Sequence, residues 1–149
     1  MEKITATWWH PEDKLIHTRI SGQVDAADVS TWAASLRQVL EKVEDNGSFK
    51  IFVDLHGFKA VDFDTHKKFR DIVPLTLAAY GWRVGYLDLF EEANGLPLYN
   101  TRGIRCFAAA HAHQDETKIA LYEERYSRPQ EHFFTDPGAA AKWIRSVHE

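Results

Sequence analysis

The alternation of β-type runs with amphipathic helical segments constrains the fold of this chain more than any other feature. Three segments have the composition of buried strands. Phe49–Leu55 is a near-continuous apolar run rich in β-branched and aromatic residues, Arg83–Leu89 is a second run of the buried type, and Ile104–Ala110 consists mostly of small and apolar residues. Such runs are typical of parallel strands that are covered on both faces. Because helical segments separate these runs along the chain, we expect βαβ units with right-handed crossovers.

Four helices are predicted by apolar residues at helical spacing. They cover Ala26–Val43, Asp64–Tyr80, Glu116–Tyr126 and a last segment that follows Asp136. Pro74 lies inside the second of these segments and predicts a kink or a break, because proline lacks a backbone donor. Asp136 followed by Pro137 is a strong start signal for the last helix.

The N-terminal region predicts an antiparallel hairpin. Ile4–Trp9 and Lys14–Ser21 are β-prone segments on either side of a turn that contains Pro11. With a short strand at His132–Phe134, the chain is predicted to form one α/β domain, residues 1–149. Its sheet should be mostly parallel, with five or six strands, the N-terminal hairpin and four helices. The segment Glu91–Arg102 is expected to be a long loop, and loops of that length are often functional.

Composition excludes several classes of function. A chain of 149 residues fits a single domain. Its net charge of −4, from 18 basic and 22 acidic residues, lacks the clustered basic charge of a nucleic-acid binder. No apolar run approaches the roughly 20 residues that span a bilayer, and the first residues do not resemble a secretory signal. Cys106 is the single cysteine, expected to be buried, so we predict a cytoplasmic protein without disulfides.

Several motifs resemble those of a known family. The segment Ile20–Asp25 (Ile-Ser-Gly-Gln-Val-Asp), a helix, and then Ile51–Phe58 resemble the STAS-type domains of bacterial anti-sigma-factor antagonists. The chain resembles their SpoIIAA-like branch more closely still, and Phe133–Pro137 matches that branch's closing strand and helix. The branch includes small stand-alone bacterial proteins, and its fold is similar to the CRAL-TRIO lipid-binding domain. The resemblance therefore implies an α/β regulatory or ligand-binding domain.

One departure from the family pattern concerns regulation. In the anti-sigma antagonists an aspartate precedes a phosphorylatable serine or threonine. Here Asp62 is followed by Phe63, which has no hydroxyl group to accept a phosphate. The resemblance thus implies a module that is not switched by phosphorylation at this position.

Titratable side chains follow three of the predicted strands. Since ligands bind outside the carboxyl ends of strands in open α/β sheets, these side chains are the candidate ligand-binding residues. They are His56, His66, Asp88, His111, His113 and Asp115. The His-x-His pair could hold a transition-metal ion together with Asp88. Alternatively, both histidines close the loop, and Asp115 favours the N-terminus of the following helix.

Common catalytic motifs are absent from the sequence. There is no glycine-rich phosphate loop and no Gly-x-Ser-x-Gly turn, so no nucleotide cofactor is predicted. Three functions remain open. They are a non-enzymatic module that binds a protein partner or a small apolar ligand, a metal-binding or hydrolase-type protein that uses the His/Asp cluster, and a lipid-binding domain. Aromatic residues that are hard to bury, such as Trp8 and Tyr99, predict a surface for homodimerisation.

Overall fold

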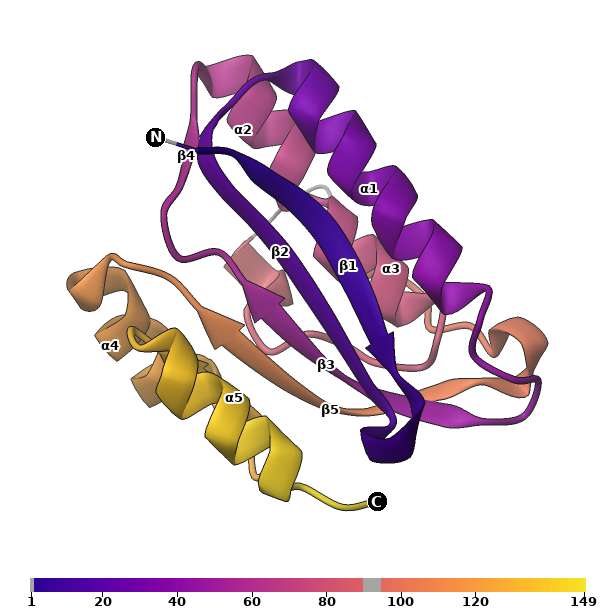
Figure 1. Ribbon diagram of the computed structural model, residues 1–149. Helices are drawn as coiled ribbons and strands as arrows, with labels where there is room; N and C mark the ends of the chain where they lie inside the picture. The colour runs from indigo at the N-terminus through magenta and orange to yellow at the C-terminus, as the bar shows by residue number, and fades with distance from the viewer. Residues whose placement is uncertain (1, 90–94) are drawn as a thin grey trace.

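A six-stranded sheet with helices on both faces forms the framework of the molecule (Figure 1). The computed structural model describes residues 2–89 and 95–149. The strands are β1 (Ile4–His10), β2 (Leu15–Val24), β3 (Ser48–Asp54), β4 (Phe58–Ala60), β5 (Arg105–Ala112) and β6 (Glu131–Phe134). The helices are α1 (Ala26–Leu40), α2 (Phe63–Arg70), α3 (Ile72–Ala78), α4 (Glu116–Tyr126) and α5 (Pro137–Ser146).

The sheet is mostly parallel, as the sequence predicts. Its strand order is β1-β2-β3-β5-β6, and β4 pairs with the last residues of β2. Only the pairing of β1 with β2 is antiparallel among the described strands. The predicted fold class, with an N-terminal hairpin and a parallel sheet, is therefore confirmed.

Aspartate side chains begin four of the helices. The carboxylates of Asp25, Asp62, Asp115 and Asp136 each accept a backbone N–H from the first turn of α1, α2, α4 and α5. The helix predicted over 64–80 is broken at Asp71 into α2 and α3. Pro74 explains the break, because it cannot donate to the carbonyl group four residues earlier.

Two apolar cores lie on opposite faces of the sheet. Trp32 of α1, Phe69 of α2 and Leu77 of α3 belong to the larger core. Ala140 and Ile144 of α5 pack against the other face. On β5 and β6, side chains alternate between the two faces, so His111 and Phe133 lie on the face that α4 covers, where Tyr122 meets the Phe133 ring at 5.6 Å.

The strand predicted at Arg83–Leu89 is wrong. This segment is irregular and ends in a 3-10 turn at Leu87–Leu89, so β3 pairs directly with β5. Val84 and Leu87 are buried and form a small separate core, whereas Leu89 is 46% exposed. An apolar run of this length reports burial and cannot by itself distinguish a strand from a buried irregular segment.

The boundaries after β5 also differ from the prediction. β5 ends at Ala112, two residues beyond the predicted strand, so His111 is a buried strand residue. The predicted long loop over 91–102 includes residues 91–94, which lie outside the described residues, and Thr101–Gly103 forms a 3-10 turn. Within residues 2–89 and 95–149, no helix combines the length and apolar character needed to cross a membrane.

Gly85 provides a test of how the irregular segment is held. A Cβ atom at this position would lie 2.2 Å from the carbonyl oxygen of Tyr126. We expect Gly85→Ala to lower the free energy of unfolding by about 1–3 kcal/mol, because the backbone must shift to relieve the overlap. Urea denaturation would measure the change. Gly138→Ala, in the first turn of α5, is the control and should change stability by less than about 1 kcal/mol.

Candidate functional site

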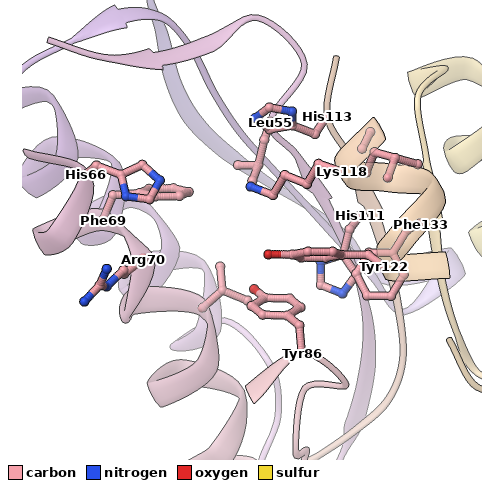
Figure 2. Close-up of a pocket in the computed structure, with 13 residues that line it drawn as sticks. Leu55, His66, Phe69, Arg70, Tyr86, His111, His113, Lys118, Tyr122 and Phe133 are labelled. Carbon is pink, nitrogen blue, oxygen red and sulfur yellow. The ribbon is translucent and has the colours of Figure 1, made fainter. Parts of the chain in front are cut away.

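A cavity of about 90 Å³ lies between α2–α3, the carboxyl end of β5, and α4 (Figure 2). Leu55, Phe69, Val73, Ile119 and Phe133 form its apolar walls. Its polar lining consists of His66, Arg70, Tyr86, His111, His113, Lys118 and Tyr122. The cavity therefore lies at the edge of the sheet where the sequence predicts a ligand site, on the face covered by α1–α4.

A second hollow of about 120 Å³ adjoins the first. The two share Leu55, His66, Phe69, His113 and Lys118 as lining residues. The second hollow reaches toward β4, whose Phe58 ring stacks on Phe69 at 4.2 Å. These five shared residues thus lie between two small adjoining spaces.

Three polar groups converge on the first cavity. Figure 2 shows the ammonium group of Lys118 and the hydroxyl groups of Tyr86 and Tyr122 directed toward the same open space, whereas the guanidinium group of Arg70 points away from it. The Lys118 ammonium group lies 5.5 Å from the centre of the Tyr122 ring. Burial lowers the pKa of Lys118, an effect that Asp115 partly offsets, and burial raises the pKa of Tyr122.

His113 is held as a neutral imidazole. Its Nδ1 accepts the backbone N–H of Asp115 at 3.0 Å, so the proton lies on Nε2. Burial, and then the nearby charge of Lys118, lower the pKa of His113 to about 4, and the other histidines contribute less. His113 can therefore donate one hydrogen bond at neutral pH and carries no charge.

His66 lies more exposed, at the mouth of the cavity on α2. Burial of part of the ring, followed by the charges of Lys118 and Arg70, lowers its pKa. Its ring lies 6.2 Å from that of Phe69. His66 is thus a titratable group beside Lys118 whose protonation is opposed by neighbouring positive charge.

A buried carboxylate holds the floor of the cavity. Glu131 is fully buried, and its Oε2 lies 2.7 Å from Nε2 of His111. Its Oε1 accepts the backbone N–H of Gly85 at 2.9 Å and a guanidinium N–H of Arg128 at 2.6 Å. Burial opposes the ionisation of Glu131, but the bonds from His111 and Arg128 outweigh it and hold its pKa below the usual value. An ionised carboxylate can only accept, so His111 donates to it.

The structure places only some of the candidate ligand-binding residues at the cavity. His66, His111 and His113 line the cavity. His56 is exposed and its side chain does not line it, while its backbone N–H donates to Asp54 at 3.1 Å. Asp115 caps α4 by accepting the N–H of Lys118 at 3.0 Å, as the alternative interpretation predicts. The side chain of Asp88 lies outside the described residues.

The metal-binding interpretation finds no support in the part of the chain that the structure describes. Among those residues, no group of three His, Cys, Asp or Glu side chains is arranged to hold an ion. His111 is bonded to Glu131 and His113 to the backbone of Asp115, so each imidazole already uses one ring nitrogen. The alternation of side chains along the strand brings the rings of His111 and His113 to one cavity. Their hydrogen bonds to separate partners do not arrange them as two ligands of one ion.

Sequence reasoning missed four important residues. Tyr86 lies in the segment mistaken for a strand, and Tyr122 lies within the predicted helix Glu116–Tyr126, away from the strand ends that the prediction considered. Lys118 lies four residues before Tyr122, on the same face of α4, which is a signal that could have been found. Glu131 is a lone acid beside a short strand, and nothing in its spacing indicates a buried role.

Comparison with models of protein families, with curated proteins and with solved structures finds no match for this chain.

Glu131 makes the stability of the domain dependent on pH. Its pKa is lower in the folded protein than its ordinary value of 4.5, so its stabilising contribution is present above pH 4.5 and is lost as the pH falls below that value. We expect Glu131→Gln to lower the free energy of unfolding at pH 7 by about 1.5–3 kcal/mol, because bonds to a buried charge are lost. The difference from the wild type should narrow toward pH 3.

Urea denaturation at a series of pH values would measure this difference. Glu124→Gln removes an exposed carboxylate from α4 and serves as the matched control. A Glu131→Gln variant as stable as the control at pH 7 would show that the buried carboxylate does not hold the cavity floor.

Proposed function

We propose that this domain is a binding module that holds a small molecule with an apolar body in the cavity between α3, β5 and α4. One observation carries the proposal: an apolar-walled cavity with a few convergent polar groups lies at the carboxyl ends of β3 and β5. Ligand sites in open α/β sheets have this location, and small-molecule sites have this kind of lining.

The size of the cavity limits the ligand. The two adjoining hollows measure about 90 and 120 Å³, each below the roughly 300 Å³ at which ordinary ligand pockets begin. A cavity of about 150 Å³ holds a benzene ring. Each hollow alone is smaller than that, so a single ring or a short chain would occupy the two adjoining hollows together, and they are too small for the bulky acyl chains that a lipid-binding domain must enclose.

The exposed side chain of Phe63 supports a module without a phosphorylation switch. Phe63 is the first residue of α2 and is 70% exposed, directly after the N-cap Asp62. It stands where the resemblance to anti-sigma antagonists places the phosphate acceptor, and it offers no hydroxyl group. Regulation at this position would have to act through contact with a partner.

The same proposal extends to the family and the partners of this domain. Membership of the SpoIIAA-like branch, with its bacterial and cytoplasmic context, is inferred from the sequence resemblance. A protein partner or a second copy of the chain is supported by exposed aromatic side chains, of which Trp8 is 42% and Tyr99 is 59% exposed.

A hydrolase-type enzyme is the second candidate, favoured by the buried pair of Glu131 and His111. A carboxylate that orients an imidazole is a component of many proton-transfer sites. However, the described lining residues include no Ser, Thr or Cys, and burial raises the pKa of Cys106, which makes its thiol unreactive. The geometry thus supplies a base without an obvious nucleophile.

This second candidate predicts turnover that depends on His111. An enzyme of this kind should hydrolyse p-nitrophenyl acetate repeatedly, and His111→Gln should lower the rate by at least about 100-fold, the usual contribution of a general base. Release of p-nitrophenolate, followed by absorbance, measures the rate. We expect no multiple turnover, since the binding proposal requires none, and a His111-dependent rate would favour the enzyme instead.

The binding proposal predicts that filling the cavity blocks the ligand. Titration of the isotope-labelled chain with toluene or benzamide should shift the amide resonances of Leu55, Ala112 and Ile119. Val73→Phe adds atoms to the cavity wall and should abolish these shifts at a cost of about 1–3 kcal/mol in stability. Leu75→Phe lies on the same helix but on its 51% exposed face, and it should bind the probes as the wild type does.

A second filling variant protects this test against misfolding. Ile119→Phe fills the same cavity from α4, on the opposite wall. Unchanged binding in both folded variants, or probes that move no amide near the cavity, would refute the proposed site.

A further inference from the structure

The polar lining of the cavity consists of hydrogen-bond donors and basic groups. Lys118, His66 and His113 face it together with two tyrosine hydroxyl groups, and none of its described lining residues is Asp or Glu. A ligand that presented only donors or positive charge would offer no acceptor to the Lys118 ammonium group or to the Nε2–H of His113. The lining therefore calls for an acceptor, and the positive charge calls for an anion.

The charge of Lys118 is not neutralised by a direct contact. Among the side chains that the structure describes, which exclude that of Asp88, none that is acidic lies within ion-pair distance of its ammonium group. Asp115, which raises its pKa, is occupied as the cap of α4. Glu131 lies beneath the floor and is already bonded to His111, Arg128 and Gly85. An incoming anion would thus find a half-buried ammonium group with unused donors.

We propose that the ligand of this cavity is an organic anion whose carboxylate or phosphate group is held by Lys118 and the Nε2–H of His113, with its apolar body against Phe69, Ile119 and Phe133. This inference rests on the proposed binding function and names the chemical class of the ligand. Lys118 and His113 line both hollows, so the charged group and the apolar body of the ligand can occupy adjoining spaces.

Binding of an anion also couples to protonation of His66. Around His66 lie Lys118 on α4, Lys59 on β4, Arg70 on its own helix and the neutral ring of His113. Lys118 and Arg70 disfavour its charged form. His113, which faces Lys118, Asp115, His56 and His66, is fixed in its neutral state by the Asp115 N–H. A bound anion favours protonated His66, so affinity should rise as the pH falls from 8 to 5.

The test compares matched probes on the full chain by calorimetry and amide chemical shifts. Benzoate should bind about 10- to 100-fold more tightly than benzamide, which has nearly the same shape but no charge. Lys118→Met should remove most of this preference, because it should weaken the binding of benzoate far more than that of benzamide. Lys142→Met, an exposed change on α5, should leave both affinities as they are, and His66→Gln should flatten the pH dependence of benzoate binding.

The possible outcomes separate this inference from the proposed function. Equal affinity for benzoate and benzamide would overturn the anionic ligand and leave the binding function standing. Binding of neither probe would overturn both. Tighter binding of phenyl phosphate than of benzoate would identify a phosphate ligand, and the reverse order would identify a carboxylate ligand. Both results support the inference. Inorganic phosphate that binds as tightly as phenyl phosphate would contradict the apolar body.

Discussion

The buried carboxylate of Glu131 is the interaction on which the candidate site depends. It binds two parts of the chain that are distant from it in sequence, the irregular segment at Gly85 and the strand residue His111, and also the side chain of Arg128 three residues before it. A buried charge of this kind is tolerated only when its lone pairs are satisfied, and here at least three donors satisfy them. Because Tyr86 follows Gly85 directly, the same bond also fixes one wall of the cavity.

The regular part of the fold could be predicted because local signals agree with one another. Two β-prone segments around the Pro11 turn predicted the hairpin, apolar runs predicted β3 and β5, and the Asp136-Pro137 pair predicted the start of α5. The segment 83–89 failed because its burial arises from long-range contacts. Gly85 lies against the carbonyl of Tyr126, and Arg128 donates to the carbonyl of Arg83 at 2.5 Å. Neither contact has a signature at the level of neighbouring residues.

The candidate site was predicted in location and only partly in composition. The rule that ligands bind at the carboxyl ends of parallel strands led to His66, His111 and His113, and the structure places all three at one cavity. It could not separate them from His56, since one residue more or less decides whether a loop side chain faces a cavity or solvent. Lys118 and Tyr122 come from the face of α4 that closes over the sheet, and that packing depends on the crossover from β5 to β6.

The two histidines at the end of β5 show why residue type alone does not decide chemistry. A His-x-His pair in extended conformation presents both rings to one side, and this geometry alone would suit a metal ion. Each ring is instead fixed by a different partner, His111 by a carboxylate and His113 by a backbone N–H. The carboxylate makes His111 a donor to the protein, and the N–H of Asp115 leaves the proton of His113 on Nε2, in a ring that lines the cavity. The arrangement of hydrogen-bond partners thus turns two potential metal ligands into a structural brace and a neutral donor, and it is the neutral donor that lies beside Lys118.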